Sequence, residues 1–140
     1  NLNLETKILS YDVYSRPWYN ELSERGIDVR VENIFSNDYS EVDEFVINFI
    51  KSEGITVVLC DGGNKIGEFN ILSKYLKLGD FILAHDYSFD KETYSKEIYG
   101  KIWNWCEITE DDIKDAVTKH NLKSYNQDLF SQSVWVCKYK

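Results

Sequence analysis

The stretches VVLCDGG at residues 57–63 and FILAHDY at residues 81–87 decide how this chain folds. Each is a short apolar run that ends in an aspartate, and a helix-like segment lies between the two. An apolar run without polar alternation is typical of a parallel strand that is covered on both faces. We therefore expect two parallel strands here, with the strand at residues 57–60 in the middle of the sheet.

Upstream of these runs the pattern also alternates between strand and helix. KILSYDVY at residues 7–14 predicts one strand, and GIDVRVENIF at 26–35, where apolar and polar residues alternate, predicts another nearer the sheet edge. Pro17 and Gly26 bracket a short helix between these strands. Ser40 is expected to cap the next helix.

Downstream, Thr109 followed by an acidic turn predicts a further helix, and SVWVCKYK at residues 133–140 predicts a closing strand antiparallel to its neighbour. The repeated strand and helix units indicate an α/β fold of the Rossmann-like kind, with a mostly parallel sheet, helices on both faces and an antiparallel C-terminal strand. No linker or repeat interrupts the pattern, so residues 1–140 are expected to form a single domain.

Composition limits the class of protein. Sixteen Lys and Arg against 24 Asp and Glu give a net charge of −8, so neither nucleic acid nor a membrane surface is an expected partner. No stretch approaches the ~18 apolar residues of a membrane span, and NLNLETK lacks the basic start of a signal peptide, which favours a cytoplasmic location. Cys60, Cys106 and Cys137 show no CxxC spacing and are expected to be reduced thiols.

The candidate site lies where strands end. The carboxyl ends of parallel strands share one edge of an open sheet, and ligands bind at that edge. Asp12, Asp61 and Asp86 are therefore expected to open onto one cleft, with His85 beside them. Carboxylates brought together in this way can hold a hard metal ion, orient a substrate hydroxyl or shift the pKa of one another.

The order of these segments resembles the class I S-adenosylmethionine-dependent methyltransferases. KILSYDVY, VRVENIF, VVLCDGGNK, FILAHDY and SVWVCKYK follow one another as strands of that family do. The chain is most similar to the small-molecule O-methyltransferase group that includes cephalosporin hydroxylase-like proteins. In that group a DG or DS turn and an HD or ED turn end the fourth and fifth strands. The resemblance runs from about residue 4 to residue 140.

The resemblance implies residues that bind S-adenosylmethionine. Asp12 would accept hydrogen bonds from the ribose hydroxyls, or alternatively cap the helix that begins near Pro17. Asn33 and Ile34 would contact the adenine amine and ring, unless Asn33 makes only a local turn. Asp61 belongs to the same cofactor-binding set.

The resemblance also implies an acceptor site. Asp61 and Asp86 would bind Mg²⁺, or else they only cap the loops that follow. His85, together with these two aspartates, would hold or deprotonate the acceptor, unless it is a structural histidine. Lys65 could neutralise a substrate anion, but an exposed helical lysine is the expected state.

One departure from the family concerns its glycine-rich loop. Family members bind the cofactor with a GxGxG turn after their first strand, and the first strand expected here matches their second. We therefore expect an N-terminally truncated methyltransferase fold. Without the missing strand, the strands at 7–14 and 57–60 would either pair directly or leave a gap that another chain fills. Exposed central strand edges are association-prone, which predicts a homo-oligomer and weak or absent cofactor binding by this chain alone.

The resulting hypothesis is a fragment of a methyltransferase that acts on an oxygen of a small molecule or sugar. Aromatic residues within 87–105 offer flat surfaces for such a substrate. The chain alone is expected to be inactive. The alternative is a noncatalytic Rossmann-like module used in assembly or recognition.

Overall fold

The computed structural model describes residues 6–140 as a chain of mixed α/β structure. The strands are β1 (Ile8–Asp12), β2 (Ile27–Val31), β3 (Val57–Cys60), β4 (Phe81–Ala84), β5 (Tyr87–Ser88), β6 (Ile108–Thr109), β7 (Lys123–Ser124) and β8 (Val136–Tyr139). The helices are α1 (Tyr19–Glu24), α2 (Glu44–Lys51), α3 (Lys65–Leu72), α4 (Lys91–Thr93), α5 (Glu110–Lys119) and α6 (Gln127–Ser131), with short helical turns η1 (Ser73–Tyr75) and η2 (Tyr94–Ile98).

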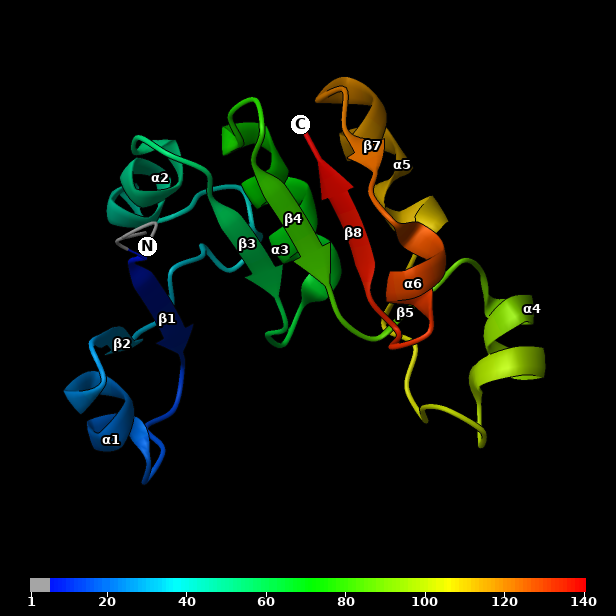
Figure 1. Cartoon of the computed structure of the whole chain (residues 1–140), viewed down its shortest axis with the longest axis horizontal. Coiled ribbons are helices and arrows are strands. Elements are labelled where there is room, and N and C mark those ends of the chain that lie inside the picture. Colours follow the sequence, from blue (N-terminus) through cyan, green and yellow to red (C-terminus); the bar gives the residue numbers. More distant parts are fainter. Residues whose placement is uncertain (1–5) are drawn as a thin grey trace, which may run out of the picture.

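The strands form three sheets rather than one (Figure 1). β1 and β2 pair in parallel, and so do β5 and β6. The largest sheet has the order β3-β4-β8-β7, in which β3 and β4 are parallel and β8 is antiparallel to both of its neighbours. The prediction of an antiparallel closing strand is thus confirmed, whereas the sheets are shorter and more mixed than the single, mostly parallel sheet that was predicted.

The strand β3 is an edge strand, so the prediction that residues 57–60 lie in the middle of a sheet is wrong for the part of the chain described. β3 pairs with β4 alone. Val57 is 57% exposed and Leu59 62% exposed, while Cys60 on the opposite face is buried. The run is apolar on both faces, as a central strand would be, but an apolar pattern does not specify what covers each face.

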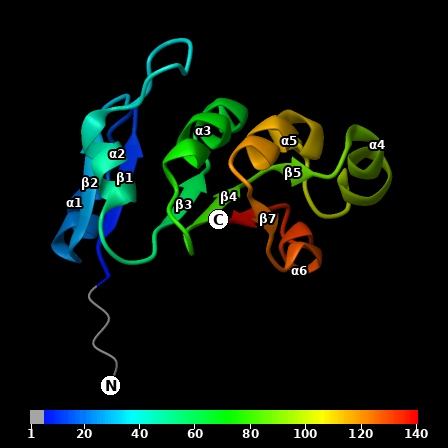
Figure 2. The same cartoon turned by 90° about the horizontal axis from the view of Figure 1, so that it is seen from above.

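The strands β1 and β3 present open edges to one another. In both views the order across the molecule is β2, β1, β3, β4, and the arrows of β1, β3 and β4 point the same way (Figures 1 and 2). Within residues 6–140, β1 pairs only with β2 and β3 only with β4. The facing edges therefore carry backbone donors and acceptors that a further parallel strand could pair with.

Helices cover the four-stranded sheet unevenly. Figure 2 shows α3 and α5 on one side of it and α6 on the other. The α3–α5 side holds the core, where Phe69, Ile82 and Ile113 are fully buried. The prediction of helices on both faces holds near β8, which α6 contacts, but not at the exposed face of β3. No helix in the described range is both long and apolar enough to cross a bilayer.

Local capping signals fix two of the helices. The backbone N–H and hydroxyl of Thr109 donate to Asp112 Oδ2 over 2.8 and 2.7 Å, which confirms Thr109 as the cap of α5. Ser40 does not cap α2 as predicted. Asp43 does so by accepting from the N–H of Phe45, while Ser40 bonds to Asp38 in the preceding loop.

Candidate functional site

The carboxyl ends of β3 and β4 bring three predicted site residues together. Cys60 and Ala84 are opposite each other in the parallel register, so Asp61 and the pair His85–Asp86 leave the sheet side by side. The N–H of His85 donates to the carbonyl of Cys60 over 3.2 Å and ties the two strand ends. One ligand atom from each of Asp61, His85 and Asp86 lies within 4.8 Å of the others.

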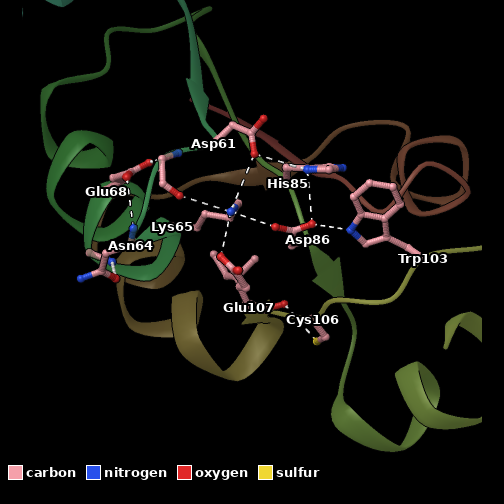
Figure 3. Close-up of polar contacts among 12 residues, drawn as sticks. Asp61, Asn64, Lys65, Glu68, His85, Asp86, Trp103, Cys106 and Glu107 are labelled. Atoms are coloured by element: carbon pink, nitrogen blue, oxygen red, sulfur yellow. Dashed lines mark hydrogen bonds and ion pairs between the residues drawn. The ribbon is translucent and has the colours of Figure 1, made fainter. Parts of the chain in front are cut away.

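The imidazole of His85 lies beside both aspartates. Its Nδ1 lies 3.3 Å from Asp61 Oδ1 and 3.3 Å from Asp86 Oδ1. The other ring nitrogen points away from these carboxylates (Figure 3). The ring lies close to two indoles, with centroid distances of 5.3 Å to Trp103 and 4.8 Å to Trp135. Both contacts are made by Nδ1, so an imidazole protonated on that nitrogen would leave Nε2 as a proton acceptor.

Asp86 is the buried carboxylate of the site. It has a φ of 57°, in the left-handed region that non-glycine residues adopt mainly where their surroundings hold them there. Its Oδ1 accepts from Trp103 Nε1 at 2.5 Å, and its Oδ2 lies 2.8 Å from Lys65 Nζ. Burial alone would raise the pKa of Asp86, but the hydrogen bonds from Lys65 and Trp103 outweigh it and lower that pKa below its usual value.

Lys65 lies at the centre of the cluster, so the expectation that it is exposed is wrong: only 6% of it is accessible. Its Nζ is 2.8 Å from both Asp86 Oδ2 and Glu107 Oε2, 3.2 Å from the carbonyl of Gly62 and 3.7 Å from Asp61 Oδ1 (Figure 3). Burial lowers the pKa of Lys65, but Asp86 and Glu107 raise it by more, so the amine stays protonated. An ammonium has three N–H donors, and here they are directed at protein oxygens rather than at a substrate anion.

The turn after β3 is held by a buried carboxylate from α3. Glu68 is 6% exposed and accepts from the N–H groups of Gly62 and Asn64 over 3.1 and 3.4 Å. A Cβ on Gly62 would lie 2.2 Å from Glu68 Oε1, so a side chain there would displace this carboxylate. Asn64 in turn caps α3 through the N–H of Gly67. The turn that positions Asp61 and Lys65 is therefore tightly packed.

Asp12 ends β1 on the side of the molecule where β3 and β4 also end (Figure 1), but no hydrogen bond or ion pair among the described residues joins it to Asp61, His85 or Asp86. It accepts from the Tyr19 hydroxyl, the N–H of Tyr14 at 3.0 Å and Arg16 Nε at 3.1 Å.

These partners, the Tyr19 hydroxyl above all, lower the pKa of Asp12 to about 2. Trp18 rather than Asp12 occupies the N-cap position of α1. Asp12 thus links the end of β1 to the following loop and to α1 by hydrogen bonds, but it does not cap that helix.

Asn33 and Ile34 also lie outside the cluster. Asn33 Oδ1 accepts from the N–H of Phe35 over 3.1 Å, which is the local turn considered as the alternative. Ile34 is half-buried and packs against the core. The amide nitrogen of Asn33 has no partner among residues 6–140, so it can still donate to a ligand.

Two further residues of the site, Glu107 and Trp135, were not among the candidates from sequence, whereas Trp103 belongs to the aromatic run expected to contact a substrate. Glu107 bonds to Lys65, Trp103 donates to Asp86, and Trp135 packs on His85. Glu107 and Trp135 come from loops far along the chain and belong to no local motif. The aromatic run had suggested the region around Trp103, yet Phe89, Tyr99 and Trp105 of that run are more than half exposed.

The implied ligands fit these residues unequally. For S-adenosylmethionine, Asp12 Oδ1 accepts one hydrogen bond and a carboxylate oxygen can accept two, so one position remains for a hydroxyl. For Mg²⁺, Asp61 and Asp86 offer suitable oxygens, but Lys65 already holds Asp86 and lies close to Asp61. The metal fits poorly while the ammonium is in place.

No family model matches the chain, and comparison with curated proteins and with solved structures gave no match either.

Proposed function

We propose that the chain is a fragment of an S-adenosylmethionine-dependent methyltransferase that acts on an oxygen of a small molecule or sugar. The observation that carries this proposal is the imidazole of His85, whose Nδ1 lies 3.3 Å from each of Asp61 and Asp86 at the carboxyl ends of adjacent parallel strands. The open edges of β1 and β3 add support, because the resemblance puts the family's first strand between them.

Methyl transfer to oxygen needs alignment of the reactants and removal of a proton from the acceptor. In the proposed mechanism Nε2 of His85 takes that proton, and Asp61 and Asp86 stabilise the imidazolium that forms. Trp103 and Trp135, whose rings lie close to His85, offer flat surfaces to a sugar or planar acceptor. S-adenosylmethionine, when bound, supplies the electrophilic methyl group, and Asp12, Asn33, Ile34 and Asp61 are the residues proposed to hold it.

The experiment is an NMR titration of the ¹⁵N-labelled chain with S-adenosylhomocysteine, the product of methyl transfer. Binding by this chain alone should be weak, so millimolar ligand is used. We expect fast-exchange shifts at the amides of Asp12, Asn33 and Asp61, and additional shifts at His85 when catechols or methyl glycosides are added. Asp12→Asn should reduce the cofactor-dependent shifts, while Asp128→Asn, an exposed change on α6, should not. Shifts confined to the opposite end of the sheet, or cofactor-dependent shifts that Asp12→Asn leaves unchanged, would contradict the proposal.

The open strand edges also favour the alternative function, a noncatalytic module for assembly or recognition. A partner strand added to β1 or β3 would satisfy the unpaired backbone groups and cover the exposed side chains of Val57 and Leu59. A homo-oligomer remains our prediction for either function. The cytoplasmic location also remains a prediction.

A further inference from the structure

We propose that the ammonium of Lys65 takes the place of a divalent cation in this site, so that the cluster of Asp61, His85 and Asp86 works without a metal and gains a metal site only when Lys65 is removed. Because the assignment concerns the same acceptor site, it rests on the function proposed above and specifies its chemistry: proton transfer at an ammonium-centred cluster.

The position of the ammonium supports this assignment. Lys65 Nζ lies 2.8 Å from Asp86 Oδ2 and 3.7 Å from Asp61 Oδ1, the two carboxylates that a metal would bridge. A Mg²⁺ ion binds carboxylate oxygens at about 2.1 Å. An ion between these aspartates would therefore share Asp86 with the ammonium at short range, and the two positive charges would repel each other.

The buried carboxylate of the cluster has a positively charged partner, and the carboxylates without a full counter-charge are exposed to solvent. The Asp86 side chain is 9% exposed and needs a partner, which Lys65 supplies. The Asp61 and Glu107 side chains are 55% and 44% exposed, so water solvates the negative charge that remains on them. The buried part of the cluster therefore has no charge left for a metal to neutralise.

The packing of Lys65 also opposes displacement of its ammonium from the cluster. It is the first residue of α3, only 6% of it is accessible, and its amine donates to the carbonyl of Gly62 in the turn that Glu68 holds. Its departure would leave Asp86 buried without a counter-charge, which is strongly unfavourable.

The ligand atoms themselves are those of a metal site. Asp61, His85 and Asp86 place one oxygen or nitrogen each within 4.8 Å of one another, and Glu107 adds a further carboxylate that contacts Lys65. Carboxylate and imidazole ligands suit divalent ions of the first transition row. Exchanging Lys65 for an uncharged side chain should therefore uncover such a site.

The test is Mn²⁺ binding followed by the loss of the free-ion EPR signal, for the wild type, Lys65→Met and Lys138→Met. Lys138 is the matched control, because it is 2% exposed and ion-paired with Glu110 but lies in no Asp–His cluster. We expect Lys65→Met to bind one Mn²⁺ per chain at least about tenfold more tightly than the wild type or Lys138→Met. Adding Asp86→Asn to Lys65→Met should abolish this gain in affinity. Equal binding by wild type and folded Lys65→Met would overturn the assignment.

A second measurement on the wild type keeps the assignment testable if Lys65→Met does not fold. Mn²⁺ broadens NMR signals of nuclei near its binding site. We expect the amides of Asp61, His85 and Asp86 to broaden no more than those around the exposed Glu53 at stoichiometric Mn²⁺. Selective broadening of the three would overturn it. Neither measurement contains cofactor or acceptor, so a failed methyltransferase assay would not be mistaken for a failed metal assignment.

Discussion

At the scale of single residues, Asp86 organises the site. Its Oδ1 accepts a hydrogen bond from Trp103 Nε1 and lies 3.3 Å from His85 Nδ1, while its Oδ2 contacts Lys65 Nζ. Its backbone is in the left-handed region, which directs the side chain into the cluster instead of along the strand. The chemistry of the site and its stability therefore depend on the same carboxylate.

Asp86→Asn should lower the free energy of unfolding at neutral pH by about 1–3 kcal/mol, because buried donors lose a charged acceptor. The lowered pKa of Asp86 means that the native state binds fewer protons than the unfolded state. This stabilisation is therefore present above the ordinary carboxyl pKa of about 4 and is lost as the pH falls through the native pKa. Urea denaturation at neutral pH and near pH 3 measures it.

The exposed residue Glu53 supplies the control, since Glu53→Gln makes the same change of charge outside the site. The difference between wild type and Asp86→Asn should shrink in acid, while Glu53→Gln should follow the wild type at both pH values. A difference for Asp86→Asn that is the same at both pH values would count against an ionised, paired Asp86.

Sequence alone predicted part of this site. Asp61 and Asp86 end two apolar runs, and parallel strands place such ends together, so their proximity follows from the pattern. The burial of Lys65 does not, because lysine is rarely buried and its partner Glu107 is 42 residues further along in a loop. The partners of Asp12 could not be predicted either, because the path of one loop brings Tyr19 and Arg16 to its carboxylate.

At the scale of elements, the turn between β3 and α3 positions both Asp61 and Lys65. The buried Glu68 holds this turn by its two backbone hydrogen bonds. Gly62 and Gly63 stand side by side in the turn, but only Gly62 lies against that carboxylate. Substituting each glycine in turn therefore distinguishes the effect of packing against Glu68 from the effect of losing a glycine.

Gly62→Ala should destabilise the protein by about 1–3 kcal/mol, because a Cβ at 2.2 Å from Glu68 Oε1 forces the carboxylate away from its donors. Gly63→Ala should have little effect, since a Cβ there meets no atom within 4 Å. Thermal and urea unfolding of both variants measure the difference. Equal stability of the two would show that Glu68 does not hold the turn.

Most helices and strands could be predicted, because their signals are local. The acidic turn after Thr109 and the apolar spacing that follows it specify α5 without reference to the rest of the chain. Pairings between distant segments could not be predicted in the same way. β5 and β6 are two residues each and pair across the segment that contains α4 and η2, and no periodicity indicates this pairing.

At the scale of the whole molecule, the edges of β1 and β3 are the feature still to be explained. Both are parallel strands with an unpaired side, and Ile8, Val57 and Leu59 are each at least half exposed. Edges of this kind pair readily with other strands. The resemblance predicted either direct pairing of these two strands or a gap that another chain fills, while the apolar pattern alone had placed β3 inside the sheet.

Leu59→Lys should weaken self-association, because a charge next to an open edge opposes strand pairing. Analytical ultracentrifugation should show concentration-dependent dimers of the wild type at micromolar concentration and more monomer for Leu59→Lys. Leu78→Lys is the control, since Leu78 is 89% exposed and lies outside the strands. A wild type that remains monomeric throughout would argue against a homo-oligomer.

The central claim is that Asp61 and Asp86 hold the Nδ1 proton of His85 and leave Nε2 as the base. Long-range ¹H–¹⁵N NMR correlation at alkaline pH, where free imidazole is neutral, reads the tautomer directly. His120 is the other histidine, and His120→Gln assigns the signals. The account predicts an Nδ1–H tautomer for His85 that loses its preference in the double variant Asp61→Asn, Asp86→Asn. An Nε2–H tautomer in the wild type would contradict it.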